Sequence, residues 1–174
     1  MTVLATPLLE IPIHFVQMEH IMEPLLLTKA FKYSGFEGAE GAIIHGAMYV
    51  DHEGLYLFHT KHTWESANSA TVAFGLVGAL IHHLCTRKKT VAYPFETTEI
   101  GNLPGELMDR FNLRKMKDST LLSIVPRDNV GELNKSFTGG ASIAVGSIKI
   151  QPIAPKGKVW KQLPELGYGG ADVF

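Results

Sequence analysis

Histidine is the residue type in this sequence with the greatest capacity for chemistry, because imidazole binds metals and transfers protons near neutral pH. Three of the eight histidines lie close together in the sequence, with acidic residues on either side. Histidine and carboxylate side chains are common zinc ligands, and a catalytic zinc site uses three of them. One hypothesis is therefore a small enzyme or a metal-binding protein that uses the histidines of the 43–62 hairpin. The candidate ligands are His52, His59 and His62.

The spacing of these histidines favours an ordinary structural role. Side chains alternate between the two faces of a strand, so His59 and His62, three residues apart, are expected on opposite faces. His52 is expected at the turn of the hairpin, well away from both. We therefore interpret the three as exposed or hydrogen-bonded side chains, and we assign no catalytic residue, no metal ligand and no cofactor.

Composition limits the remaining possibilities. The formal net charge is −1, which argues against a general nucleic-acid-binding protein because such proteins carry an excess of positive charge. Cys85 is the only cysteine, so neither an intrachain disulfide nor a cysteine-based zinc site can form, and a cytoplasmic location is expected. Apolar residues make up 45% of the 174 residues, which is enough for the core of one domain.

The elements that would position the histidines form the clearest hairpin in the sequence. Residues 41–50 and 54–62 are rich in strand-forming residues and flank a short polar loop that ends in Gly54, as a tight turn requires. Side chains alternate between the two faces of a strand, and large apolar residues fall on both faces of the second arm. Both faces are therefore expected to be largely covered. One face carries Leu55, Leu57 and His59, and the other carries Tyr56, Phe58 and Thr60.

The whole pattern predicts an α+β fold built on a mainly antiparallel sheet or a partly open barrel. We expect an N-terminal arm at 1–24, a single domain at 25–150 and an irregular C-terminal tail at 151–174, in which Trp160 is the expected docking anchor. A short helix is expected at 128–137. The further predicted strands lie at 25–33, 90–95, 107–115, 120–126 and 141–150.

One apolar helix, near 67–85, is predicted as an insertion between strands. Small residues recur four apart along it, which places them on one helical face and allows another backbone to approach closely. Its uncharged centre is shorter than the roughly 20 apolar residues that a bilayer crossing needs. This helix is therefore expected to pack against a protein surface. The predicted packing or partner surface consists of Ala67, Thr71, Gly75, Ala79 and Phe74.

A basic patch follows this helix at Arg87, Lys88 and Lys89. An apolar helix with a basic flank is typical of contact with a membrane surface, and weak contact of this kind is one possibility. Such helices usually carry charge along the face opposite the apolar one, and this helix carries none until its end. Burial in a homo-oligomer or against a protein partner is therefore the preferred interpretation.

Part of the sequence resembles pleckstrin-homology-like domains of the bacterial, GRAM-related type. The resemblance covers roughly residues 25–127 and implies an antiparallel barrel that a C-terminal amphipathic helix plugs. The lipid-binding members carry basic residues around the first hairpin loop. Here Lys29 and Lys32 lead into a loop that contains Glu37 and Glu40, which would repel phosphates, so inositol-lipid binding is not implied. The residues that carry the resemblance are Met48, Tyr49, Val50, Leu55, Tyr56, Leu57, Phe58, Tyr93, Pro94, Phe95 and Ile100.

The sequence therefore favours a non-catalytic binding or assembly domain. Its contacts with a protein or lipid partner would involve the sheet and the predicted apolar helix. The competing hypothesis remains the small enzyme or metal-binding protein that uses the hairpin histidines.

Overall fold

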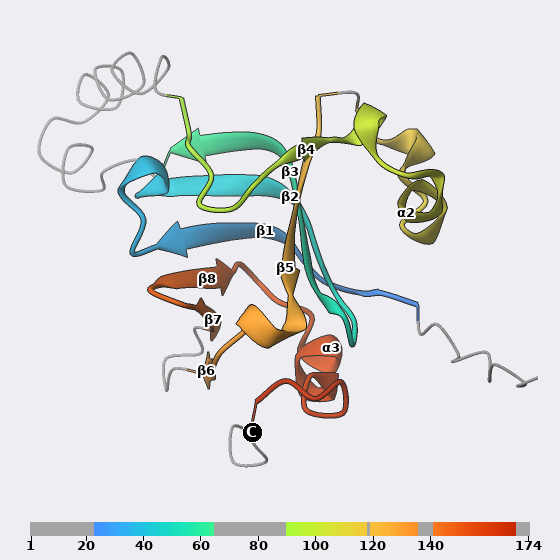
Figure 1. Ribbon diagram of the computed structural model, residues 1–174. Coiled ribbons are helices and arrows are strands. Elements are labelled where there is room, and N and C mark those ends of the chain that lie inside the picture. The colour runs from blue at the N-terminus through green and yellow to red at the C-terminus, as the bar shows by residue number, and fades with distance from the viewer. Residues whose placement is uncertain (1–22, 65–89, 118, 136–140, 170–174) are drawn as a thin grey trace, which may run out of the picture.

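The computed structural model describes residues 23–64, 90–117, 119–135 and 141–169, which form an eight-stranded antiparallel sheet (Figure 1). The strand order is β4-β5-β3-β2-β1-β8-β7-β6, so β4 and β6 are the two edges and the sheet remains open between them. This arrangement confirms the prediction of a mainly antiparallel, partly open sheet. The strands are β1 (Leu25–Ser34), β2 (Ala42–Val50), β3 (Gly54–Trp64), β4 (Thr98–Glu99), β5 (Leu121–Pro126), β6 (Leu133–Lys135), β7 (Ala141–Val145) and β8 (Ile148–Pro152).

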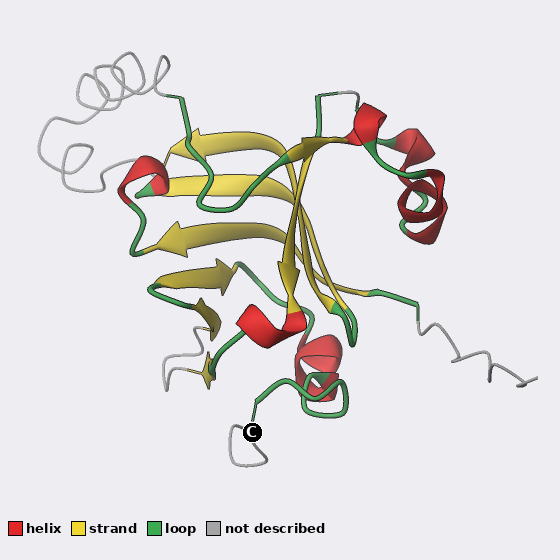
Figure 2. Cartoon of the chain, viewed as in Figure 1, coloured by secondary structure: helices red, strands yellow, loops and turns green. Residues whose placement is uncertain are grey.

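Short helices lie at the margins of this sheet (Figure 2). Among the described residues, two are α-helices of six residues each, and the others are 3-10 helices of three residues. Within the described ranges, no helix is long and apolar enough to cross a membrane. The predicted apolar helix at 67–85 and most of the predicted arm at 1–24 lie outside the described residues. The helices are η1 (Glu37–Ala39), η2 (Ile100–Asn102), α2 (Gly105–Arg110), η3 (Leu113–Lys115), η4 (Arg127–Asn129) and α3 (Gly157–Gln162).

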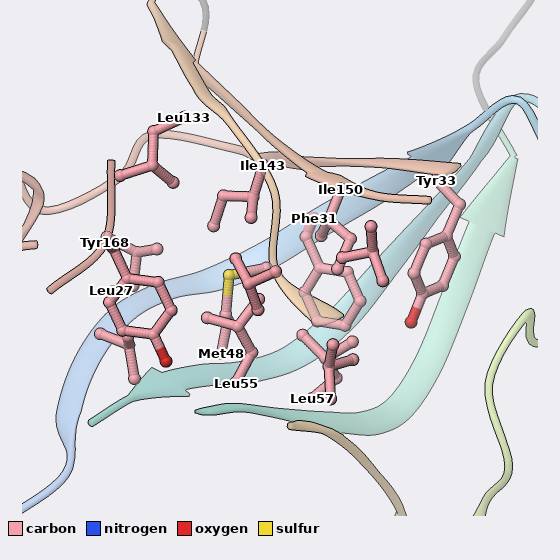
Figure 3. Packing of buried hydrophobic residues seen from close by; sticks show 14 of the residues in the cluster. Leu27, Phe31, Tyr33, Met48, Leu55, Leu57, Leu133, Ile143, Ile150 and Tyr168 are labelled. Carbon is pink, nitrogen blue, oxygen red and sulfur yellow. The ribbon is translucent and has the colours of Figure 1, made fainter. Parts of the chain in front are cut away.

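The main hydrophobic cluster fills the inside of the curled sheet (Figure 3). Strands from both halves of the sheet contribute to it, because β6, β7 and β8 curl over the inner face of β1, β2 and β3. Alternate residues of β3 enter this cluster, while the residues between them face outward. Its central members are Leu27, Phe31, Met48, Leu55, Leu57, Leu133, Ile143 and Ile150.

A second hydrophobic cluster covers the outer face of β2, β3 and β5. Helix α2 and η3 supply its cover through Phe111 and Leu113, which are 6% and 1% exposed. Both faces of β3 are therefore buried, as the alternating pattern predicted. The sheet residues of this cluster are Ala47, Tyr56, Phe58 and Leu122.

The hairpin of β2 and β3 follows the predicted turn. The Asp51 carboxylate accepts hydrogen bonds from the backbone N–H groups of Glu53 and Gly54, with N···Oδ1 distances of 2.8 and 3.2 Å. Asp51 N–H also donates to the Gly54 carbonyl. Aspartate favours turns because its side chain closes this type of local ring. The turn is further tied to the C-terminal segment, since the Tyr168 hydroxyl donates to the Asp51 carbonyl at 2.8 Å.

A bulge interrupts the pairing of β2 with β3. Gly46 pairs with His59 and His45 pairs with Lys61, so Thr60 has no partner residue on β2. The backbones approach so closely that a Cβ atom on Gly46 would lie 1.8 Å from the Phe58 carbonyl oxygen. The extra residue reverses the alternation of side chains along β3 after this point.

Four predicted segments differ from the structure. Residues 90–95 form no strand but a loop, which is consistent with Pro94 lacking a backbone N–H. Residues 107–115 belong to α2 and η3 and not to a strand, because Leu107, Met108 and Phe111 place apolar groups on the second cluster at helical spacing. The described part of the predicted helix at 128–137, residues 128–135, contains the end of η4 and the strand β6 in place of a helix. Residues 141–150 contain two strands, β7 and β8, because Gly146 turns the chain at φ +59°.

The segment after Gln151 is more ordered than the predicted irregular tail. It contains α3, and its side chains enter the main cluster. Trp160 is 4% exposed, which confirms it as a docking anchor. Leu163 and Tyr168 extend the contact, so this segment closes one end of the core.

Replacing Gly46 by alanine should destabilise the fold by about 3 kcal/mol, because the new methyl group would overlap a backbone carbonyl that cannot move without distorting β3. Urea unfolding of the purified variant measures this loss. Gly101→Ala is the matched control, since a Cβ atom at Gly101 meets nothing within 4 Å. Equal stability of the two variants would contradict the close approach at Gly46.

Replacing Arg110 by methionine should cost about 3 kcal/mol of stability, because it leaves the buried Asp51 carboxylate without its charged partner. Arg110 Nη2 lies 2.7 Å from Asp51 Oδ2, and the two side chains are 17% and 1% exposed. The control is Arg114→Met, which removes an ion pair to Asp109 whose side chains are 76% and 64% exposed, and which should cost less than about 1 kcal/mol. Thermal and urea unfolding of both variants would test this difference.

Candidate functional site

His59 is the centre of a buried aromatic cluster on the inner face of the sheet. It is 2% exposed, and its ring packs against Tyr93 with a centroid distance of 4.2 Å. The Phe31 ring lies 5.6 Å away in an edge-on arrangement, and Phe95 packs against Tyr33 at 5.9 Å. We call Phe31, Tyr33, His59, Tyr93 and Phe95 the His59 cluster. Its members come from β1, β3 and the loop before β4.

Hydrogen bonds fix the protonation of the His59 ring. Nδ1 lies 3.3 Å from the Leu121 carbonyl oxygen, and Nε2 lies 2.8 Å from the Tyr33 hydroxyl. A carbonyl only accepts hydrogen bonds, so in the neutral ring Nδ1 carries the proton and Nε2 accepts from the Tyr33 O–H. Both ring nitrogens are therefore engaged within the fold.

Burial keeps this cluster uncharged at neutral pH. It lowers the pKa of His59 to about 4, an effect that the hydrogen bond to Leu121 only partly offsets. Burial also raises the pKa of Tyr33 well above its ordinary value, with a further contribution from Tyr93, whose own pKa burial raises. A general base works best with a pKa near the working pH, so His59 is poorly matched to proton transfer near neutrality.

A buried serine lies on the same face as His59 without engaging it. Ser123 on β5 is fully buried opposite Leu57, two residues from Leu121, the partner of His59 in the sheet. Its hydroxyl has no hydrogen-bond partner among the described residues. A serine nucleophile needs a hydrogen-bonded base, so Ser123 and His59 do not form a nucleophile–base pair in this arrangement.

The three candidate metal ligands occupy different environments. His52 is exposed at the turn, His59 is buried, and His62 is half-buried with its ring 5.9 Å from that of Trp64. The bulge at Thr60 brings His59 and His62 to the same face of β3, so the expectation of opposite faces is wrong. Over the described ranges, no three or more histidine, cysteine, aspartate or glutamate residues gather closely enough to hold a metal ion.

A set of half-buried apolar side chains, which shares Tyr93 and Phe95 with the His59 cluster, borders the main hydrophobic cluster. Phe36 precedes η1 and Trp64 ends β3, and the rest belong to the loop before β4. The loop is held beside η1 because Ala92 N–H donates to the Gly38 carbonyl at 3.0 Å. These side chains combine packing against the core with exposure to solvent. The set consists of four aromatic residues and one valine, and we call it the aromatic rim: Phe36, Trp64, Val91, Tyr93 and Phe95.

The residues behind the family resemblance divide between three places. Tyr93, Pro94 and Phe95 lie in a loop and not in a strand. Met48, Val50, Leu55 and Leu57 belong to the main cluster, and Tyr49, Tyr56, Phe58 and Ile100 contact or belong to the second. The predicted helix surface (Ala67, Thr71, Phe74, Gly75 and Ala79) and the basic patch (Arg87, Lys88 and Lys89) lie outside the described residues.

No sequence pattern predicts that Tyr33 and Tyr93 contact His59. Tyr33 lies at the end of a predicted strand and Tyr93 in a different segment, and only the pairing of β1 with β2 and the course of the loop bring them to His59.

Comparison of the chain with protein-family models, curated proteins and solved structures finds no match. The functional assignment therefore depends on the geometry of the chain alone.

His59 should make the fold sensitive to acid. Its pKa is about 4 in the folded chain against an ordinary value of 6.5, so the unfolded chain takes up the proton first as the pH falls. The free energy of unfolding should therefore decrease as the pH falls through the window between those two values. The total decrease across the window should be about 3 kcal/mol. Urea unfolding at a series of pH values across this window measures the effect.

His59→Gln should reduce that pH dependence, because glutamine does not titrate. His52→Gln is the matched control: His52 is exposed at the turn, and this substitution should leave the pH dependence unchanged. An acid-induced loss of the same size in His59→Gln as in the unsubstituted chain would show that other groups cause it.

Proposed function

We propose that this chain is a non-catalytic binding domain whose partner surface is the aromatic rim. The observation that carries the proposal is the state of the rim residues, which pack against the core on one side and remain half-exposed on the other. Tyrosine, tryptophan and phenylalanine are enriched at protein interfaces, where they supply most of the binding energy. The partner is a protein segment with apolar side chains.

The chemistry of the His59 cluster supports binding over catalysis. His59 is neutral, and both ring nitrogens already have partners within the fold. The hydroxyl of Tyr33 is also engaged. Phe31, Tyr33 and His59 would therefore act as a rigid base beneath Tyr93 and Phe95, which keeps the exposed edges of these two rings in fixed positions.

We also propose that the sheet is a pleckstrin-homology-like variant, in agreement with the resemblance in the sequence. Support comes from the β2–β3 hairpin and from α3, which follows the last strand and inserts Trp160 into the main cluster. Helix α3 has only six residues, so it would be a reduced form of the plugging helix. Self-assembly through the Ala67–Ala79 surface, and a cytoplasmic location, remain proposals from the sequence.

Binding at the aromatic rim can be measured by the fluorescence of Trp64. The variant Trp160→Phe leaves Trp64 as the only tryptophan, and a tryptophan-free amphipathic peptide with leucine and phenylalanine on one face and glutamine on the other is the probe. We expect a saturable shift of the Trp64 emission, because the peptide would displace water from the indole ring.

Tyr93→Ser and Phe95→Ser should each weaken this binding by about tenfold or more, as expected for aromatic residues at the centre of an interface. Tyr49→Ser is the matched control, since Tyr49 packs on the second cluster at the outer face. Circular dichroism verifies the fold of each variant. An unchanged affinity in both rim variants, or no emission change with the unsubstituted rim, would disprove the proposed function.

A further inference from the structure

We infer that the chain's own N-terminal segment, residues 15–22, packs on the outer face of the sheet at Leu26 and Tyr49. This surface is separate from the aromatic rim, so its occupant does not depend on the proposed function. Three features support the assignment: an incomplete cover on the outer face, the point at which the chain enters β1, and the composition of the residues before that point.

The cover of the second hydrophobic cluster is incomplete on its β1 side. The Phe111 ring packs against Tyr49, Tyr56 and Phe58 with centroid distances of 5.2, 4.7 and 5.4 Å, so this cover lies over β2 and β3. Leu26 pairs with Tyr49 across β1 and β2, and both side chains border the cluster in a half-buried state. An apolar surface therefore remains partly exposed where β1 begins.

The chain enters the sheet at this same surface. Residues 1–22 lie outside the described residues, and Glu23 and Pro24 lead directly into Leu25, the first residue of β1. Four residues separate Met22 from Leu26, which is about 13 Å of fully extended chain. A short tether of this kind gives an effective concentration on the order of millimolar, so modest apolar contacts are sufficient for docking.

Other apolar surfaces are less accessible to this segment. The inner face at the same end of the sheet is closed by the C-terminal segment, where Lys156 N–H donates to the Leu27 carbonyl and the Tyr168 hydroxyl donates to the Asp51 carbonyl. The aromatic rim lies at the opposite end of β1, since Phe36 follows the last residue of this ten-residue strand. Such a strand is about 33 Å long. The outer surface at Leu26 is therefore the open surface that residues 15–22 reach first.

The composition of the segment favours burial. Thirteen of the first 22 residues are apolar, a larger share than the 45% of the whole chain, and Glu10 and Glu19 are the only acidic or basic residues apart from histidine. Segments that stay hydrated without packing are poor in apolar residues and rich in charge. Packing against Leu26 and Tyr49 would remove apolar surface from water on both sides. The apolar residues nearest the tether are Phe15, Val16, Met18, Ile21 and Met22.

Hydrogen exchange of the full chain, followed by mass spectrometry, tests this contact. We expect the amides of residues 15–22 to exchange at least about tenfold more slowly than those of a synthetic peptide of residues 1–22. Leu26→Ser should abolish this protection. Leu25→Ser is the matched control, because Leu25 is also half-buried but packs against the main cluster on the inner face, and it should retain the protection. Thermal unfolding verifies that both variants fold.

A double-mutant cycle measures the contact independently. The segment variant combines Phe15→Ser, Met18→Ser and Ile21→Ser, and its effect on the folding equilibrium constant is measured with and without Leu26→Ser. We expect the joint effect to fall short of the product of the separate effects by at least about threefold, as for groups in contact. In the control cycle with Tyr93→Ser at the aromatic rim, the effects should multiply.

Each outcome has a definite meaning. Exchange of residues 15–22 at the rate of the free peptide, protection that survives Leu26→Ser, or multiplying effects in the Leu26 cycle would overturn the inference. Protection that increases with protein concentration would assign the surface to a second copy of the chain and would also overturn it. Protection that is independent of concentration, retained in Leu25→Ser and lost in Leu26→Ser would support docking of the chain's own segment.

Discussion

The hydrogen bonds and the ion pair of Asp51 are the interactions on which most of this structure depends. The Asp51 side chain is 1% exposed, and its carboxylate closes the β2–β3 turn through two backbone N–H groups while pairing with Arg110 at the end of α2. The carbonyl of the same residue accepts the Tyr168 hydroxyl from the C-terminal segment. One residue thus connects the first hairpin to the cover of the outer face and to the segment that closes the core. A buried charge is stable only when it is paired and hydrogen-bonded, so these elements stabilise one another.

Arg110 links this turn to the second cluster by more than charge. Its guanidinium contacts both Asp51 and Glu53 and lies 5.5 Å from the centre of the Tyr56 ring. The hydrogen bond from Arg110 contributes most to holding the pKa of Glu53 below its ordinary value. Because α2 has only six residues, it would be a poor helix alone, and these contacts together with Phe111 hold it against the sheet. The helix is therefore a product of tertiary contact more than of local propensity.

The bulge at Thr60 determines the character of the opposite end of the sheet. It allows β3 to bend, and it places His62 and Trp64 on the same inner face as His59. The end of β3 then meets η1 and the loop before β4, where aromatic side chains are only half covered. Packing that is complete at one end of the core and incomplete at the other produces the aromatic rim.

The sequence alone determined part of the local structure, above all the β2–β3 hairpin. The alternation of Leu55 and Leu57 with Tyr56 and Phe58 predicted a strand buried on both faces, and the polar loop ending in Gly54 predicted its turn. Trp160 was identifiable as an anchor from its place in a segment rich in proline and glycine. The tertiary structure decided what those elements contact. The bulge, the helical course of 105–115 and the meeting of Tyr33 and Tyr93 with His59 depend on residues distant in the chain, and spacing along one strand carries no information about them.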